Sequence, residues 1–460
     1  MRTLVLSVLA ATCAAGLAAQ TRRATNNAPA GAAASAAPLG QYTPVPELPG
    51  MGRPVDIAAT TARRRALAQR VGRGVVLIPA AHERNLELDY IQDNDFRQHN
   101  TFFYFTELET QEAWLLMAVR GPDSVETVLF LPPRNPRTER WTGVRIGPDS
   151  LAARLSGIAT VLPTDSLNRR LQVARFTARG PVWVPLDVTT RDEDRIDDLV
   201  FDGADVRNLR PIADSMRLIK DAEELARLQK AVDISVAGHI AAMQASRPGM
   251  WEYELEAALE AGFRRNGADR LGYPSIVGSG INGTTLHYDV SRKQTRDGEL
   301  VVIDAAAEWG QYTADITRTF PVNGKFTPRQ KAIYDLVLAT QQAAFDSIKV
   351  GVTTMGDIGR IARTYMTANS GTLCGEGGCT QYFIHGLGHW IGMDVHDVGD
   401  YSTPLKPGMA FTIEPGIYIP AESMGVRIED CVVITPEGPR WMSAGAPRTT
   451  ADIERVMQRR

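Results

Sequence analysis

Two aspartates in the C-terminal half stand where paired strands would bring them together. Asp304 follows the apolar residues 301–303, and Asp315 comes eleven residues later, beyond a turn at Gly310. This spacing predicts a hairpin in which the two carboxylates face each other. Taken alone, the hairpin favours a plainer interpretation, in which Asp304 merely ends a strand and Asp315 forms a weak surface ion pair with Arg318.

Three of the seven histidines fall within twelve residues, at His385, His389 and His396. The glycines at 386 and 388 let backbone or ligand approach closely, and they argue against placing the first two histidines on a helix. Such a group of imidazoles suggests a metal or proton-transfer site.

Two glutamates interrupt apolar segments further along the chain. Glu414 breaks an apolar strand just before a Pro-Gly turn, and a buried carboxylate there needs a cation or a proton. In residues 425–435 the two-residue alternation of a strand puts Arg427, Glu429 and Cys431 on one face. We therefore expect Arg427 and Glu429 to share a site.

Together these residues match the ligands of a metal centre. The set comprises four carboxylates and one imidazole, from Asp304, Asp315, His389, Glu414 and Glu429. Five ligands are more than one metal ion with an open coordination position needs, and they suit two ions with bridging carboxylates. Four negative charges then balance two divalent cations. An oxygen-rich set with one histidine favours Mn(II) and would also accept Co(II) or Zn(II).

The elements that must position this set fall into two domains. Over residues 51–210, apolar runs alternate with stretches of helical composition, which predicts a mixed α/β domain with strands near 74–78, 113–117, 125–131 and 181–186. Residues 211–455 form the second domain, with strands expected at 300–305, 409–419 and 426–435 and helices at 328–349 and 354–369. The fold class is therefore α+β.

A long helix should open the second domain. Asp221 and Glu224 form a capping box, after which apolar positions recur on one helix face that also carries His239. A histidine on such a face is more often a hydrogen-bonded core residue than a ligand, so we leave His239 out of the site.

The N-terminus has the layout of a secretory signal. Arg2 precedes an apolar stretch over residues 4–15, and small residues follow at Ala18 and Ala19. The stretch is shorter than the roughly 20 apolar residues of a membrane anchor, which favours cleavage near Ala19. We therefore expect a signal peptide over residues 1–19, a flexible linker over 20–50, and an exported mature chain without a membrane span, periplasmic or extracellular.

The expected export affects whether two of the cysteines can form a disulfide. Cys374 and Cys379 flank a glycine-rich loop, and an oxidising compartment would allow a disulfide between them, with two free thiols as the alternative. Cys431 is expected to be a buried thiol.

The composition of the 460 residues is that of a globular protein, with 44% hydrophobic and 22% charged residues. A net charge of −3 leaves no basic excess to neutralise a phosphate backbone. Nucleic acid is therefore not an expected partner.

These blocks resemble the pita-bread metallopeptidases that cleave next to proline, the Xaa-Pro aminopeptidases and the Xaa-Pro dipeptidases (prolidases). The resemblance also covers YIQDNDFRQHNTFFYFTELE and RLIKDAEELARLQKA. It implies a mixed α/β N-terminal domain followed by a pita-bread catalytic domain. In the ligand set it implies that Asp304 chelates one ion, that Asp315 and Glu429 bridge both ions, and that His389 and Glu414 complete the second.

The same resemblance assigns further roles. A hydroxide between the ions would be the nucleophile, and Glu414 would take its proton and later pass one to the leaving amine. His287 and His396 would bind the substrate carbonyl and the tetrahedral intermediate, and His385 would line the proline side. Tyr418 and Arg427 would support the ligands or contact the substrate.

Two positions depart from the pattern of this family. Ala306 stands where the family usually has glycine, which matters only if the position needs a positive φ. Glu107 replaces a common glycine and puts the local turn in question. Every metal ligand is present, which argues against the creatinase-like members of the fold, because these use no metal.

The resemblance thus implies an exported metalloaminopeptidase that releases the first residue of proline-containing Xaa-Pro peptides, working as a homo-oligomer (dimer or tetramer). A prolidase uses the same metals but accepts only dipeptides, and the sequence hardly separates the two. A non-catalytic peptide-binding module is the alternative from another class. The complete ligand set argues against it, because unpaired buried carboxylates are costly.

Overall fold

The computed structural model describes residues 45–82, 96–186, 196 and 204–458. Val45–Arg460 form one compact unit. The predicted signal peptide and most of the predicted linker lie outside the described residues. Within these ranges, none of the helices is long and apolar enough to cross a bilayer.

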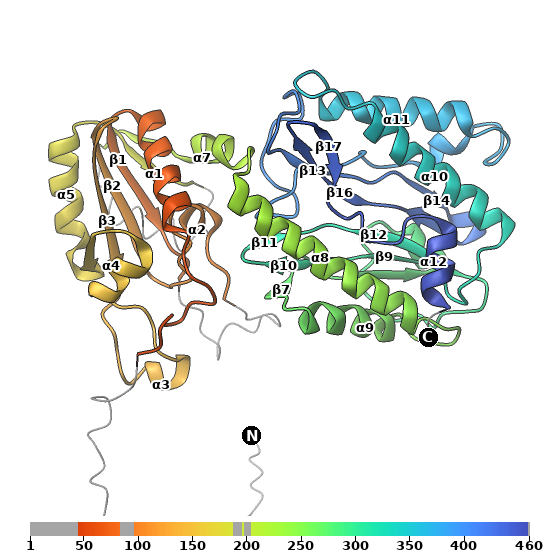
Figure 1. Ribbon diagram of the computed structural model, residues 1–460, viewed down its shortest axis with the longest axis horizontal. Helices are drawn as coiled ribbons and strands as arrows, with labels where there is room; N and C mark the ends of the chain where they lie inside the picture. Colours follow the sequence, from red (N-terminus) through yellow and green to blue (C-terminus); the bar gives the residue numbers. More distant parts are fainter. Residues whose placement is uncertain (1–44, 83–95, 187–195, 197–203, 459–460) are drawn as a thin grey trace, which may run out of the picture. The chain divides into compact units, whose positions relative to one another are not determined.

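The N-terminal half is built on a mixed six-stranded sheet (Figure 1). Its strand order is β4-β3-β2-β1-β5-β6, with the central β2 antiparallel to both β1 and β3 and the remaining neighbours parallel. The bounds are β1 Gly74–Pro79, β2 Trp114–Gly121, β3 Ser124–Leu131, β4 Thr160–Pro163, β5 Val182–Val184 and β6 Val206–Asn208. The four predicted apolar strands are thereby confirmed.

Helices cover both faces of this sheet, which explains why its inner strand β1 is continuously apolar. Val75 and Leu77 of β1 join the core that contains helix α5 (Leu167–Ala178). Val76 and Ile78 join the core on the side of α1 (Ile57–Val71) and α2 (Asn100–Thr106).

Helices and small sheets form the C-terminal half, as the predicted α+β class requires. The capping box of Asp221 and Glu224 opens α8 (Ala222–Ala245), and His239 on this helix is buried, with Nε2 2.9 Å from the carbonyl oxygen of Ala305. Both predictions are confirmed. The other helices are α7 Arg210–Arg217, α9 Glu252–Arg265, α10 Pro328–Asp346, α11 Met355–Asn369 and α12 Thr450–Met457.

The predicted Asp304 hairpin is confirmed, although its pairing is interrupted. The turn at Gly310 joins the short strands β10 (Ala307–Trp309) and β11 (Tyr312–Thr313), and beyond the interruption β9 (Leu300–Asp304) pairs antiparallel with β12 (Thr317–Pro321) in the same register. Asp304 lies opposite Thr317, and Asp315 precedes β12 in irregular backbone. Arg318 binds the buried Asp430 at 2.6 Å and not Asp315, so the plainer surface interpretation is wrong.

The two long strands predicted at 409–419 and 426–435 are each broken in the middle. The first consists of β13 (Ala410–Ile413) and β14 (Gly416–Ile419), and the second of β15 (Met424–Arg427) and β16 (Asp430–Thr435). β13 pairs with β16, and β14 pairs with β15. Both segments therefore pass from one sheet to the other, and they do so next to each other. Glu414 and Glu429 lie at this crossing.

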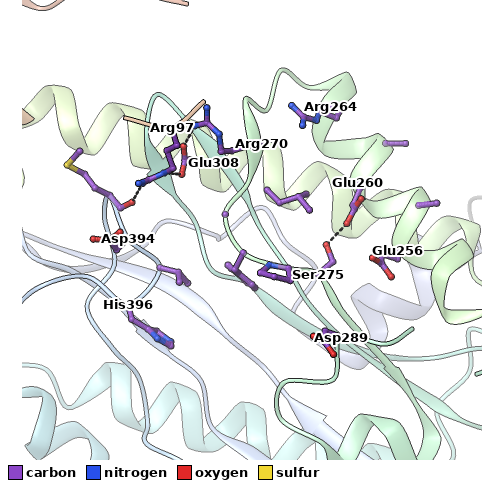
Figure 2. A pocket seen from close by; sticks show the side chains of 18 residues that line it. Arg97, Glu256, Glu260, Arg264, Arg270, Ser275, Asp289, Glu308, Asp394 and His396 are labelled. Atoms are coloured by element: carbon purple, nitrogen blue, oxygen red, sulfur yellow. Dashed lines mark hydrogen bonds and ion pairs between the residues drawn. The ribbon is translucent and has the colours of Figure 1, made fainter. Parts of the chain in front are cut away.

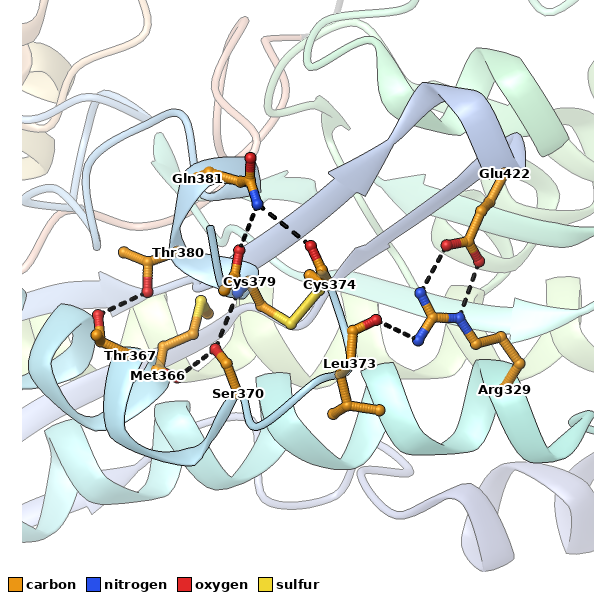
Figure 3. Close-up of a disulfide and its surroundings, with 11 residues drawn as sticks. Arg329, Met366, Thr367, Ser370, Leu373, Cys374, Cys379, Thr380, Gln381 and Glu422 are labelled. Carbon is orange, nitrogen blue, oxygen red and sulfur yellow. Dashed lines mark hydrogen bonds and ion pairs between the residues drawn. A yellow bond between two sulfur atoms is a disulfide. The ribbon is translucent and has the colours of Figure 1, made fainter. Parts of the chain in front are cut away.

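A disulfide joins Cys374 and Cys379 after α11, and Figure 3 shows the loop that it closes. Cys379 is fully buried, and its amide donates to the hydroxyl of Ser370 at 2.9 Å. Arg329 of α10 donates to the carbonyl of Leu373 in the same loop. Of the two alternatives left open by the sequence, the structure thus has the disulfide, and Cys431 is a buried free thiol as expected.

Both departures from the family pattern are accommodated. Ala306 is buried and is not among the described residues with positive φ. Glu107 ends α2 in the left-handed region with φ 51°. Its carboxylate accepts hydrogen bonds from Arg63 of α1 at 3.0 Å and from Arg227 of α8 at 2.7 Å. Two buried ion pairs thus hold the Glu107 side chain at a position whose left-handed backbone would be unstrained for glycine.

We predict that Glu107→Ala lowers the free energy of unfolding by about 3 kcal/mol, because it leaves two buried guanidinium groups short of a partner. Glu107→Gly removes the same carboxylate but relieves the left-handed backbone, so it should be about 1 kcal/mol more stable than the alanine variant. Urea unfolding followed by tryptophan fluorescence measures both. Wild-type stability in the alanine variant would contradict the prediction.

Candidate metal centre

A cavity of about 270 Å³ contains most of the predicted site residues. Among the residues that line it are His287, Asp304, Asp315, His389, His396, Glu414 and Glu429. The other three predicted site residues lie beside it: His385 and Arg427 contact its lining residues Glu414 and Asp304, and Tyr418 contacts both His385 and Arg427. The structure therefore brings all ten predicted residues to one place.

His389 is the common neighbour of three of the four carboxylates. Its Nε2 lies 3.3 Å from Asp315 Oδ2, 3.4 Å from Glu414 Oε1 and 3.7 Å from Glu429 Oε1. Asp315, His389 and Glu429 each offer one ligand atom, and these atoms all lie within 4.8 Å of one another. Such proximity is what a shared cation requires.

The charges of this cluster are unfavourable without a counter-ion. Burial raises the pKa of Asp315 and of Glu414 well above the usual range, and the nearby charge of Glu429 adds to both effects. Burial opposes the charging of His389, but the nearby carboxylates of Asp315, Glu429 and Glu414 together outweigh it and raise the pKa of the imidazole to about 12. Buried anions that repel one another are stabilised by a divalent cation.

One orphaned atom supports the same conclusion. Glu429 is 1% exposed, and its Oε1 has no hydrogen-bond partner among the described residues. Its other oxygen accepts from the Thr317 hydroxyl at 2.8 Å. A buried carboxylate oxygen normally has a partner, so the donor set fits a bound divalent metal ion.

Neighbouring backbone segments fix the positions of His389 and Glu414. The amide of Glu414 donates to the carbonyl of Leu387 at 2.7 Å, and the amide of Thr412 donates to the carbonyl of His389 at 2.8 Å. The histidine segment therefore runs beside β13. Gly388 is required at this contact, since a Cβ there would lie 2.0 Å from the carbonyl oxygen of Thr412.

The thiol of Cys431 holds the main chain of Asp315. Its sulfur accepts from the Asp315 amide at 3.3 Å and donates to the Asp315 carbonyl at 3.1 Å. Because Asp315 lies in irregular backbone between β11 and β12, this contact from β16 helps to fix a predicted metal ligand.

Arg427 and Glu429 share the site as expected, although they lie on either side of a strand break. Arg427 donates to Asp304 Oδ2 at 2.6 Å and to the hydroxyl of Thr317 at 3.0 Å, and that hydroxyl in turn donates to Glu429. Arg427 also donates to the Tyr418 hydroxyl at 2.8 Å. The guanidinium therefore orients two predicted ligands, Asp304 directly and Glu429 through the Thr317 hydroxyl.

The three remaining histidines occupy different surroundings. His385 lies with Nε2 2.9 Å from the Tyr418 hydroxyl, and burial together with Arg427 lowers the pKa of its imidazole to about 4. His287 and His396 are exposed side chains on the cavity wall. The ring of His396 lies edge-on to His389, with 4.3 Å between centroids.

Sequence reasoning missed Tyr273. Its hydroxyl lies 2.7 Å from Asp304 Oδ1 and 2.5 Å from Asp315 Oδ1, so it links two predicted ligands. Tyr273 precedes β8 (Ile276–Ser279), which pairs with β9. That long-range pairing and the pairing of β7 (Arg270–Leu271) with β10 bring it to the site, and nothing in its local sequence indicates a role.

Comparisons with known proteins agree with this geometry. Residues 226–436 match the model of metallopeptidase family M24, and residues 60–181 match that of the aminopeptidase P N-terminal domain. The chain is 35% identical to an Xaa-Pro aminopeptidase from Escherichia coli, over 86% of this chain and 96% of the relative.

Solved structures give the same result. Proline aminopeptidase P II from Yersinia pestis superposes with a TM-score of 0.81 at 34% identity, covering 88% of this chain and 100% of the other. Zn-substituted E. coli aminopeptidase P in complex with product has the same TM-score and identity, covering 88% and 99%. These neighbours confirm the predicted two-part fold.

We predict that Mn(II) stabilises the protein, by about 2.7 kcal/mol when its free concentration is 100 times the dissociation constant. Glu429→Gln should lose most of the bound metal while its metal-free form is at least as stable as the wild type, because one repelling charge is gone. Glu437→Gln, on an exposed turn, is the matched control. Elemental analysis and thermal unfolding give the two readouts, and full metal content in Glu429→Gln would contradict the assignment.

Proposed function

The chain belongs to the M24 metallopeptidases of the Xaa-Pro aminopeptidase group, and on that premise we propose that it is an exported two-metal enzyme that releases the first residue of Xaa-Pro peptides. It is a metalloaminopeptidase, and its family uses divalent metal ions. One observation carries the proposal, namely that all five candidate ligands line a single small cavity.

We propose that Asp304, Asp315, His389, Glu414 and Glu429 hold two ions, with Mn(II) favoured and Co(II) or Zn(II) as alternatives. Four carboxylates against one imidazole support this choice. When bound, two such ions supply a water of lowered pKa and polarise the scissile carbonyl.

The side chains around this centre would move the protons. Glu414 already has a raised pKa, which suits a carboxylate that takes a proton from the attacking water and returns it to the leaving nitrogen. His287 and His396 reach the cavity from exposed positions and would donate hydrogen bonds to the substrate carbonyl as negative charge develops there.

The surroundings of the cavity favour an aminopeptidase over a dipeptidase. A second cavity, of about 1200 Å³, adjoins it and is shown in Figure 2. The two share Tyr273, Pro274, Asp289, Val395 and His396 as lining residues. Open space therefore continues from the ligand cluster, and a peptide longer than two residues can be accommodated.

Two features support export. The chain starts with an apolar stretch of signal-peptide length. The Cys374–Cys379 disulfide fits an oxidising compartment, since such bonds are rare in reducing ones. We also propose a homo-oligomer, because the resemblance to the family implies one.

Substrate choice can be tested with three peptides in one mixture. We expect the Mn(II)-loaded protein to remove the first residue of an Xaa-Pro-Yaa tripeptide and to leave an Xaa-Ala-Yaa tripeptide intact, as mass spectrometry would show. Glu414→Ala should lower kcat by about a thousandfold, the size of a lost general acid–base group. Cleavage of an Xaa-Pro dipeptide alone would establish a prolidase, and no cleavage at all would favour a binding role.

Export can be tested by expressing the full chain in a Gram-negative bacterium. The intact mass of the periplasmic protein should correspond to loss of residues 1–19 and to one disulfide. Leu9→Arg breaks the apolar stretch and should leave the full-length chain in the cytoplasm, because a charge in this region blocks recognition of the signal. A full-length wild-type chain confined to the cytoplasm would refute export.

A further inference from the structure

His396 lies in a segment that has little structure of its own. Residues 391–400, all within the described part of the chain, form neither helix nor strand. The imidazole is nevertheless held edge-on to His389 at the cavity wall. Contacts from other elements must therefore set its position.

Two aspartates flank this histidine, and one arginine holds both of them. Nη2 of Arg217, the last residue of α7, donates to Asp394 Oδ2 at 2.9 Å and to Asp397 Oδ1 at 2.5 Å. Lys220 donates to the other oxygen of Asp397 at 3.0 Å. The side chains of Arg217, Lys220 and Asp397 are at most 3% exposed.

The packing around this group leaves little freedom. A Cβ on Gly392 would lie 2.2 Å from Asp397 Oδ2 and 2.9 Å from Lys220 Cε, so the segment folds tightly over the ion pair. Contacts from the N-terminal half add to this. Arg97 donates to the carbonyl of Met393 at 2.5 Å (Figure 2), and Asn100 donates to Asp394.

Buried ion pairs are poor sources of net stability, because desolvation offsets their attraction, but they can specify one arrangement. We propose that Arg217 is a positioning residue for His396. By binding the carboxylates on both sides of the histidine, it fixes the place of the imidazole on the cavity wall. The catalytic part of this inference rests on the proposed function, whereas the ordering of residues 391–400 does not.

A double-mutant cycle tests whether Arg217 acts through His396. With an Xaa-Pro-Yaa peptide, His396→Ala should lower kcat/KM about 100-fold, the size of a lost oxyanion donor, with most of the loss in kcat. We expect Arg217→Met to lower kcat/KM about 30-fold with metal content unchanged. The kcat/KM of the double variant should lie within about threefold of that of His396→Ala, because Arg217 cannot act through an imidazole that is absent.

Independent losses would give a double variant about 3000-fold below wild type, and that result would overturn the proposal. Arg217→Lys keeps the charge but lacks the planar fork, so it should recover part of the activity. It also keeps the test valid if the methionine variant does not fold. Arg210→Met, on an exposed position of the same helix, is the matched control and should retain wild-type kinetics.

Hydrogen–deuterium exchange provides a readout that does not depend on activity. Peptides covering residues 391–400 should exchange faster in Arg217→Met than in the wild type, while peptides from β9 remain unchanged. If the wild type cleaves no Xaa-Pro peptide, the proposed function fails and exchange alone decides the positioning role. Unchanged exchange over residues 391–400 would overturn it.

Discussion

Buried negative charge at the ligand cluster is the constraint on which the rest of the structure depends. Buried carboxylates that lie close together repel one another, and the raised pKa values of Asp315 and Glu414 express that cost. Polar groups of the protein stabilise part of this negative charge, since Arg427 binds Asp304 and the Thr317 hydroxyl binds Glu429. These contacts leave Glu429 Oε1 without a partner among the described residues, and a metal ion would complete the balance.

Strands and irregular segments contribute different parts of this site. Asp304, Glu414 and Glu429 lie at a strand end and at a strand crossing, where backbone pairing fixes them, whereas Asp315 is held by the thiol of Cys431. Backbone bonds to β13 hold His389, but His385 and His396 lie on segments that arginine side chains hold. Arg363 of α11 donates to the carbonyls of Phe383 and His385, at 2.9 and 2.6 Å, beside the disulfide loop. Arginine side chains thus fix the backbone beside two of the histidines.

The sequence predicted the chemistry of the site better than its connections. Asp304 and Glu414 could be found because ionisable residues next to apolar runs are conspicuous. The hairpin across the Gly310 turn could also be predicted, because β9 pairs with β12 across it, but the interruption of its pairing has no local signal. Strand alternation correctly put Arg427 and Glu429 together, although the strand is broken between them, and the Thr317 hydroxyl links the two side chains. Tyr273 had no local signal, and its place depends on β8 pairing with β9.

The N-terminal half contacts the catalytic half through ion pairs as well as through a shared apolar core, which joins Phe102 to Leu228 and Tyr312. Glu308 of β10 accepts from Arg97 at 2.7 Å and also binds Arg270, while Arg53 binds Asp269 at 2.7 Å. Such pairs cost desolvation, so their use is better explained by registry than by stability. A shift of the N-terminal half would unpair several of these charges at once, including the buried Glu308. Registry between the halves and the placement of the His396 segment are linked through Arg97, which binds both Glu308 and the carbonyl of Met393.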